Sequence, residues 1–563
     1  MQRGQGGGCG RWVAGCLWVA MAAAQAQAQA QPATGPAAGS GGGFRLPTLP
    51  APAAPNPGAA SGELPDLGLG IGAPLVVQRV RFEGAGRLLL PEADLHTLVA
   101  PFLNRPLRAL EVEELRQRVT RALVERGFVN SGAVFPEAPF AAGTLTVRIV
   151  QGTLSRLRQA GLERLHEDYI AARLPGPDEP LNANALQERF QLLLADPLFA
   201  QVNARLLPGE ALGLATLELD VQRARPWSLG LFANNHLAPA VGSAAAGLDA
   251  TVRNLTGWGD ALAVTAYASD GTLNRDASFT LPVAARTTLA SLRLARTRTS
   301  LIEEPVALLD IASRVTTREV GLSHPFIDGA RQRFTLGLTH ALRRNTTTLA
   351  GEPFSVVPGE PTGTTRIEAW RLAPEFTWRL DRHVVALRAV AVRGRNNATE
   401  APAGSAAPPV RYSLWQLQTQ AALELGSGAR QLVLRAQAQH SPDRLVPLEQ
   451  MAIGGRFSVR GFRENTLVRD SAASASAELH WPVWRSDTWR GALRLVPFVD
   501  AGIGANDGER SRRLSSAGLG FVLALADVEG ELFAARRLGR PPAQTSGDLQ
   551  DHGIHLALRC RWP

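Results

Sequence analysis

The stretch AASASAELHW, residues 472–481, changes between small or apolar residues and polar residues at almost every step. Successive side chains of an extended strand point to opposite faces, so this stretch predicts a β-strand with one apolar and one polar face. The apolar face would carry Ala473, Ala475, Ala477, Leu479 and Trp481, and the polar face Ser474, Ser476, Glu478 and His480.

The same alternation recurs along the C-terminal part of the chain, for example in RFTLGLTH (333–340), RQLVLRAQAQ (430–439) and GIHLALRCRW (553–562). The strands run about ten residues, the length of strands in membrane barrels. At roughly 20 residues per strand and connection, residues 226–563 give about 16 antiparallel strands. A secreted β-sandwich also alternates and is the alternative, but strand length and the N-terminal signal favour a membrane β-barrel.

The N-terminus, residues 1–30, has the pattern of an export signal. Arg3 and Arg11 supply positive charge, an apolar run follows, and Ala-Gln repeats then offer cleavage sites. No other stretch approaches the roughly 18 apolar residues of a membrane helix, so any membrane crossing would use strands. Residues 31–74 are rich in Pro, Ala and Gly and predict a flexible linker.

Two consecutive α/β units are predicted between the linker and the barrel. Residues 75–152 show the order β-α-α-β-β, including a helix over 111–126 that ends at a glycine. Residues 153–225 repeat this order, with helices expected over 166–174 and 182–196. Two copies of one unit in succession indicate a tandem array.

Composition excludes several classes of function. The chain has a net charge of +9, and all 59 basic residues are arginine, because lysine is absent. A P-loop or a Schiff-base enzyme needs a lysine, so both are excluded. Arginine is interleaved with acidic residues, so the sequence does not indicate a basic strip that binds nucleic acid. Cys560 is the only cysteine beyond the signal, and neither an HExxH nor a GxSxG motif occurs. We therefore predict no catalytic residue, no cofactor and no metal site.

The stretch GGRFSVRGFRE, residues 454–464, places arginines beside glycines between two strand-like runs. Glycines allow a sharp bend, so this segment could fold into a wet barrel lumen. A half-buried Arg460 there would need an acidic partner. Alternation places Phe498, Asp500 and Gly502 on one side of a later strand, so Asp500 could be that partner. The alternative is a solvated Arg460 and an unrelated Asp500 in a turn.

Two motifs resemble the paired signatures of the superfamily that joins POTRA domains to an outer-membrane barrel. They are SVRGF at 458–462 and FVDAG at 498–502. In that superfamily the VRGF/Y loop enters the barrel, and its arginine contacts the inner wall at the F-x-D-x-G strand. The resemblance implies a loop motif of Val459, Arg460, Gly461 and Phe462, and a wall motif of Phe498, Asp500 and Gly502.

The longer context EQMAIGGRFSVRGFRE is similar to the TpsB group of two-partner secretion transporters, which export haemolysins and haemagglutinins. NLTGWGD (254–260) and HPFID (324–328) resemble landmarks of their barrels, and the two α/β units resemble their POTRA domains. The chain departs from the pattern at three places. Phe462 replaces a tyrosine common in this group, Pro563 follows the terminal aromatic residue, and residues 31–74 offer no obvious helix to plug the pore.

The resemblance implies a translocator rather than an enzyme. Its POTRA domains would lie in the periplasm and capture a secreted, TpsA-type partner protein that is still unfolded. The barrel, a monomer surrounded by outer-membrane lipid, would pass this partner to the cell surface without nucleotide hydrolysis and without binding nucleic acid. An insertase for other barrels, and a passive porin or adhesin, are the alternatives. Two POTRA units favour the secretion group, and a porin would leave both units without a role.

Overall fold

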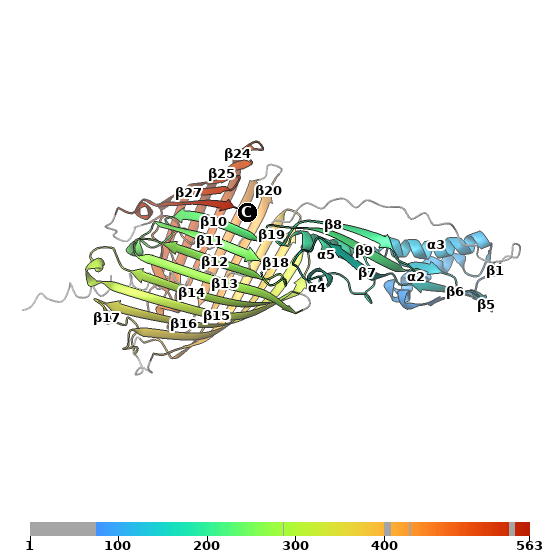
Figure 1. Cartoon of the computed structure of the whole chain (residues 1–563), viewed down its shortest axis with the longest axis horizontal. Helices are drawn as coiled ribbons and strands as arrows, with labels where there is room; N and C mark the ends of the chain where they lie inside the picture. The colour runs from blue at the N-terminus through green and yellow to red at the C-terminus, as the bar shows by residue number, and fades with distance from the viewer. Residues whose placement is uncertain (1–74, 285–286, 399–406, 427–429, 540–546, 563) are drawn as a thin grey trace, which may run out of the picture. The chain divides into compact units, whose positions relative to one another are not determined.

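The computed structural model describes residues 75–284, 287–398, 407–426, 430–539 and 547–562. The expected signal, the expected linker and the terminal Pro563 lie outside these described residues. The described chain forms two compact units divided after Ala224, an N-terminal α/β unit and a C-terminal β unit (Figure 1).

The first half of the α/β unit is a small sheet covered by helices. Strands β2, β6 and β4 lie side by side in that order, and β5 adds to β6. On α3, the residues Val112, Leu115, Val119 and Leu123 are fully buried at helical spacing. The elements are β1 (Leu75–Val76), β2 (Arg79–Glu83), η1 (Ala85–Leu89), α2 (Glu92–Val99), η2 (Ala100–Phe102), β3 (Pro106–Leu107), α3 (Ala109–Glu125), β4 (Gly132–Val134), β5 (Phe140–Ala141) and β6 (Thr144–Val150).

The second half repeats the arrangement around a core of its own. Its sheet has the order β7-β9-β8, so β8 lies at an edge. The helix expected over 166–174 is confined to one turn, since Pro175 disfavours helical geometry in the residue before it. The elements are β7 (Thr153–Ala160), α4 (Asp168–Ala171), α5 (Ala183–Leu194), β8 (Phe199–Pro208) and β9 (Leu214–Arg223).

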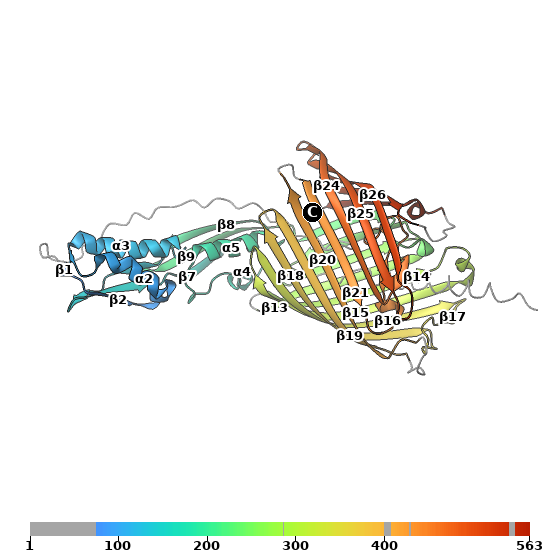
Figure 2. The same cartoon turned by 180° about the vertical axis from the view of Figure 1, so that it is seen from behind.

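Among the described residues, sixteen antiparallel strands close into a barrel (Figure 2). The first strand, β10, pairs with the last, β28. The expected barrel of about 16 strands is confirmed. The strands are β10 (Trp227–Asn234), β11 (Ala245–Arg253), β12 (Ala261–Ala268), β13 (Thr272–Ala284), β14 (Thr288–Ser300), β15 (Ile311–Asp328), β16 (Gln332–Leu349), β18 (Thr364–Leu380), β19 (His383–Asn396), β20 (Arg411–Leu425), β21 (Arg430–His440), β24 (Ser471–Ser486), β25 (Gly491–Ala505), β26 (Arg512–Leu525), β27 (Val528–Arg537) and β28 (Ile554–Trp562).

The direction of the alternation separates the barrel from the sandwich. In β24 the apolar Trp481 is exposed, whereas the polar Ser474 and Glu478 are buried. A sandwich would bury the apolar face against its second sheet. Apolar residues outside and polar residues inside are the pattern of a barrel surrounded by lipid.

Among the described residues outside the segment 441–470, short 3-10 helices occur in three loops that join barrel strands, and the two-residue strand β17 (Glu352–Pro353) pairs with the end of β16. These helices are η3 (Pro239–Val241), η4 (Val306–Leu309) and η6 (Leu549–His552). In the described ranges, no helix is both long enough and apolar enough to cross a membrane.

Candidate functional site

The segment between β21 and β24, residues 441–470, packs against the inner wall of the barrel, and we call it the inner hairpin. It contains η5 (Pro447–Glu449) and the antiparallel pair β22 (Met451–Ile453) and β23 (Leu467–Arg469). Its apolar side chains form a buried cluster that includes two residues of the barrel wall, Ala472 on β24 and Leu514 on β26. The buried members are Ile453, Val459, Phe462, Leu467, Ala472 and Leu514.

Three glycines shape the tip of the inner hairpin. Gly454, Gly455 and Gly461 have φ angles of 116°, 93° and 87°, a region that L-residues with a side chain rarely adopt. A Cβ at Gly455 would stand 1.9 Å from the carboxyl carbon of Glu464, so a side chain at residue 455 has no room. Burial in this turn raises the pKa of the Glu464 carboxyl to about 8, which favours its neutral form near neutral pH.

Arg460, at the tip, is one of the most completely buried large side chains among the described residues, with 1% of its surface exposed. Its Nε and Nη2 donate to the two carboxylate oxygens of Asp500 at 2.8 and 2.6 Å, and its backbone N–H donates to the same carboxylate at 3.0 Å. Nη1 donates to Glu478 at 2.7 Å, and Nη2 donates to Ser476 at 2.9 Å. Two carboxylates on β24 and β25 therefore neutralise one buried guanidinium.

Aromatic rings complete the pocket around this guanidinium. The carbon Cζ of Arg460 lies 3.5 Å from the ring centroid of Phe498 and 4.9 Å from that of Phe533. The two rings pack edge to face, with centroids 5.7 Å apart. A cation over a desolvated ring face is attracted by its quadrupole, so Phe498 holds the guanidinium as well as covering it.

Gly502, the last residue of the wall motif, makes room for the hairpin. A Cβ at this position would stand 2.7 Å from Cγ2 of Ile453 and 2.9 Å from Cγ2 of Val459. Both side chains belong to the buried cluster of the inner hairpin. The wall motif thus contributes a ring, a carboxylate and a gap on one face of β25.

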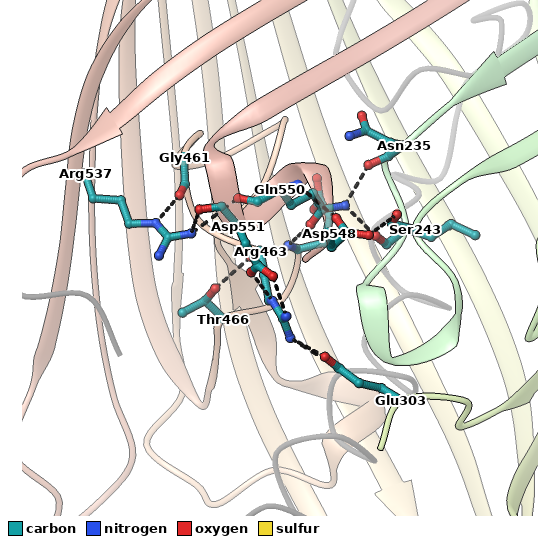
Figure 3. Close-up of polar contacts among 12 residues, drawn as sticks. Asn235, Ser243, Glu303, Gly461, Arg463, Thr466, Arg537, Asp548, Gln550 and Asp551 are labelled. Atoms are coloured by element: carbon teal, nitrogen blue, oxygen red, sulfur yellow. Dashed lines mark hydrogen bonds and ion pairs between the residues drawn. The ribbon is translucent and has the colours of Figure 1, made fainter. Parts of the chain in front are cut away.

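The other two arginines of the 454–464 stretch also pair with acids of the wall or of its loops. Arg456 donates to both carboxylate oxygens of Glu531 on β27 at 3.1 and 2.7 Å. Arg463 donates to Asp551 at 2.5 and 2.8 Å and to Glu303 at 2.8 Å, as Figure 3 shows. Each arginine of the tip is therefore held by a different part of the barrel.

Gln550 connects the hairpin to the place where the first and last barrel strands meet (Figure 3). Its side chain is fully buried and donates to the backbone oxygens of Asn235 at 2.6 Å and Leu237 at 2.7 Å. Its side-chain oxygen accepts from the backbone N–H of Glu464 at 2.8 Å. One amide group thereby joins the loop after β10, the loop before β28 and the inner hairpin.

A row of charges on the opposite side of the hairpin reaches across five strands. Glu449 in η5 accepts from Arg371 on β18 at 2.7 Å and from Arg343 on β16 at 3.3 Å. Arg343 also donates to Glu319 on β15 at 3.3 Å. Glu319 accepts from Arg293 on β14, and Arg293 in turn donates to Asp276 on β13 at 2.6 Å. Signs alternate along the row, so each buried charge has an opposite neighbour.

The structure brings together most of the residues expected from the two motifs. Arg460 meets Phe498 and Asp500, and Val459 meets Gly502. Phe462 lies in the buried cluster of the inner hairpin, and its ring centroid is 5.4 Å from the guanidinium carbon of Arg537. The backbone N–H of Gly461 donates to Nε2 of His555.

Sequence reasoning missed Glu478 as the second acid on Arg460, although its position on the polar face of β24 was visible. It also missed the partners of Arg456, Arg463 and Glu449. The three arginines in one glycine-rich turn were the available signal, because buried arginines require acids.

The described residues contain no group of three or more His, Cys, Asp or Glu side chains placed to hold a metal ion. Cys560 on β28 is a free thiol.

Known protein families and individual proteins resemble this chain in sequence. The family of haemolysin secretion/activation proteins ShlB/FhaC/HecB matches residues 213–523, and the POTRA domain of ShlB type matches residues 75–152. The outer membrane transporter CdiB of Escherichia coli is 24% identical over 498 residues, which span 85% of this chain and 81% of CdiB. CdiB of Dickeya dadantii is 23% identical over 437 residues, or 76% of this chain and 75% of that protein.

Solved structures share the fold. CdiB from Escherichia coli superposes with a TM-score of 0.70 at 21% identity, covering 89% of this chain and 93% of that one. CdiB from Acinetobacter baumannii superposes with a TM-score of 0.63 at 17% identity, covering 91% and 95%. The haemolysin secretion/activation family matches more than half of the sequence, and the fold agrees with it. The chain therefore belongs to this family of two-partner secretion transporters, which sit in the outer membrane with their POTRA domains in the periplasm.

Proposed function

We propose that the protein captures one exported partner protein in the periplasm while the partner is unfolded, and passes it through the barrel to the cell surface. The single observation that carries this proposal is the inner hairpin, which is fixed inside a closed barrel by the buried contacts of Arg460 with Asp500 and Glu478. A hairpin that occupies the lumen must shape or regulate any passage through it.

The energetics of Arg460 explain why this contact can control the lumen. Removing one member of a buried charge pair leaves the other member uncompensated, which costs about 3–5 kcal/mol. The hairpin therefore stays in one position unless an entering chain replaces its contacts. In our proposal the loop motif of Val459, Arg460, Gly461 and Phe462 holds the lumen in a conducting shape or moves as one body.

Capture is assigned to the two POTRA domains, residues 75–152 and 153–225. Strand β8 lies at the edge of its sheet over ten residues and exposes Leu206 and Leu207 beside its free backbone edge. An unfolded chain can add a strand to such an edge through backbone hydrogen bonds. This mode suits a partner whose sequence is variable, since backbone groups supply most of the contacts.

Transport in this proposal uses no nucleotide and involves no catalysis. The sequence has no lysine to bind the phosphates of a nucleotide. Folding of the partner outside the cell would prevent its return and supply the direction. The transporter works as a monomer within outer-membrane lipid and takes a TpsA-type protein as its partner.

Secretion by an Arg460→Ala variant tests the proposal. The variant is co-expressed with a TpsA-type partner protein, and the partner secreted into the medium is measured. We expect secretion to stop while the transporter stays in the membrane fraction. Arg435→Ala is the matched control, because Arg435 contacts the same Glu478 at 2.7 Å from β21 but does not belong to the hairpin.

Normal secretion by Arg460→Ala would show that the fixed hairpin is not needed for transport. A mature protein that stayed in solution after lysis without detergent would contradict the barrel in lipid, and the transport proposal with it. Equal loss of secretion in Arg435→Ala would assign the effect to Glu478 alone rather than to the hairpin.

A further inference from the structure

Arginines on neighbouring barrel strands lie directly opposite one another in the sheet. Arg298 on β14 is the register partner of Arg314 on β15, and Arg296 on β14 is the partner of Arg275 on β13. All four side chains are exposed. Like charges in directly opposed positions destabilise a strand pair, so these contacts do not serve the stability of the barrel on their own.

The pattern continues around the wall. Arg344 on β16 is opposite Arg366 on β18, and Arg395 on β19 is opposite Arg411 on β20. These side chains are exposed as well. We call the eight arginines of the four opposed pairs the outer arginine band, which spans strands β13 to β20.

The band lies on the outer face of the barrel. In β14, Arg296 and Arg298 continue the alternation of the exposed Leu292 and Leu294, whereas Arg293 points to the lumen. Arg366 shares its face of β18 with the exposed Trp370, and Arg411 shares its face of β20 with the exposed Trp415. Tryptophans mark the interface between lipid and water, so the band begins where the apolar surface ends.

The protein supplies almost no negative charge to this band. On the outward face of the described strands β13 to β20, near the band, the one acidic residue is Glu368, and it is already bonded to Arg395 and His340. The other seven arginines have no ion pair and no side-chain hydrogen bond within the described part of the chain. Four opposed pairs of arginines, with Glu368 as the one acid among them, form a surface that is complementary to anions.

The band faces the outside of the cell. The chain enters the barrel at Trp227 from the periplasmic domains, so β10 begins at the periplasmic end. Strands alternate in direction, and the end of β14 and the beginning of β15 therefore lie at the outer end. The outer leaflet of an outer membrane is built from lipopolysaccharide, whose lipid A carries phosphate groups at the depth where the acyl chains end.

We propose that the outer arginine band binds the phosphate groups of lipopolysaccharide. A guanidinium presents paired donors that match two phosphate oxygens. A phosphate bound between two opposed arginines would attract both of them and offset their mutual repulsion. The acyl chains of the same molecule would cover the exposed leucines and tryptophans beside the band. The apolar surface and the band together fit one amphipathic anionic lipid.

The test compares how strongly lipid A binds to the unaltered full-length protein, to a variant and to a control, all in neutral detergent. The variant carries Arg298→Gln, Arg314→Gln, Arg344→Gln and Arg366→Gln. The matched control carries four glutamines in place of exposed arginines at the opposite end of the barrel, namely Arg331→Gln, Arg382→Gln, Arg485→Gln and Arg490→Gln. Bound lipid is counted by native mass spectrometry while bisphosphorylated lipid A is titrated. We expect about tenfold weaker binding by the variant, and no change in the control.

Two further probes identify the chemistry that the band recognises. Lipid A from which the phosphates have been removed should bind the unaltered protein and the variant equally weakly. Phosphatidylglycerol should bind the unaltered protein more weakly than lipid A does. Equal affinity for phosphatidylglycerol would assign the band to anionic lipid in general and overturn the proposal, as would equal lipid A affinity in the variant and the unaltered protein, or an equal loss in the control.

Folding is checked by gel electrophoresis, because an unheated, folded barrel migrates differently from the same protein after heating. If the fourfold variant does not fold, the pair Arg298→Gln and Arg314→Gln is compared with Arg485→Gln and Arg490→Gln. The thermal midpoint gives an independent measurement, because lipid A should raise it in the control and less in the variant. A midpoint that lipid A raises equally in both proteins would contradict the proposal.

Discussion

Arg343 and Arg344 are neighbours in the sequence, yet they lie on opposite faces of the same barrel wall. Arg343 points inward and is shared by the carboxylates of Glu319 and Glu449. Arg344 points outward and faces another arginine, Arg366, across the strand pair. The same contrast holds for Arg293 and Arg371, which point inward and are paired with acids, and for Arg296 and Arg298, which point outward and face other arginines.

This comparison shows that the face of a strand, more than the residue type, decides what an arginine does. A guanidinium enclosed by protein needs a carboxylate nearby, since an unpaired buried charge is costly. A guanidinium on the outer face meets water or lipid headgroups and needs no partner from the protein. The four predictions below test this contrast, beginning with the largest effect.

Arg460→Ala should have the largest effect on the inner face. It leaves Asp500 buried without its cation, whereas Glu478 keeps Arg435, and we expect the native state to lose about 3–5 kcal/mol. Hydrogen exchange of residues 441–470 should accelerate while that of distant strands changes little. Unchanged protection of the hairpin would mean that Arg460 does not hold it in place.

Arg343→Gln and Arg344→Gln form the most direct test of the two faces. Removing Arg343 withdraws charged hydrogen bonds from Glu319 and Glu449, but each acid keeps a second arginine, so we expect a loss of about 2 kcal/mol. Arg344→Gln should leave the stability in neutral detergent almost unchanged. Stability is measured by reversible unfolding in urea. Equal effects of the two substitutions would remove the distinction between the faces.

Gly502→Ala tests how closely the inner face fits the hairpin. The added Cβ would collide with Ile453 and Val459, and we expect a loss of about 1–2 kcal/mol from overpacking. Gly530→Ala is the matched control, because the atoms nearest to its Cβ are 3.8 and 3.9 Å away. Thermal unfolding of both variants measures the difference. A control as destabilised as Gly502→Ala would point to the general cost of altering a strand glycine.

Arg298→Gln should have the smallest effect, and its sign should depend on the surroundings. In neutral detergent it relieves the repulsion from Arg314, so the thermal midpoint should rise slightly. In nanodiscs that contain lipid A the same substitution removes a phosphate contact, and the midpoint should fall. A thermal midpoint that shifts in the same direction in both surroundings would show that Arg298 does not contact lipid A.

The order of elements could be read from the sequence to a large extent. The helix expected over 111–126 is α3, Ala109–Glu125, because its buried residues repeat at helical spacing. The alternation of 472–481 lies within β24. The alternation of side chains along a strand was enough to place Asp500 and Gly502 on the same face of β25. These features depend on residues close in sequence, where local geometry determines which side chains share a face.

The partners of the hairpin could not be predicted in the same way. Glu478 reaches Arg460 because Ser476 is the register partner of Asp500, and the register between strands is a property of the assembled sheet. Arg463 meets Asp551 and Glu303, which are distant from it in sequence. No local pattern links these residues, because closure of the barrel brings them together.

The sequence by itself determined that this chain forms two small α/β domains followed by a barrel of about sixteen two-faced strands. It also identified Arg460 and Asp500 as candidates for one contact. Only the tertiary structure decided which acids neutralise each arginine, and that outward arginines face one another. The physical reason is that alternation sets the face of a residue within its own strand, whereas strand register and the path of the inner hairpin set its neighbours across the barrel.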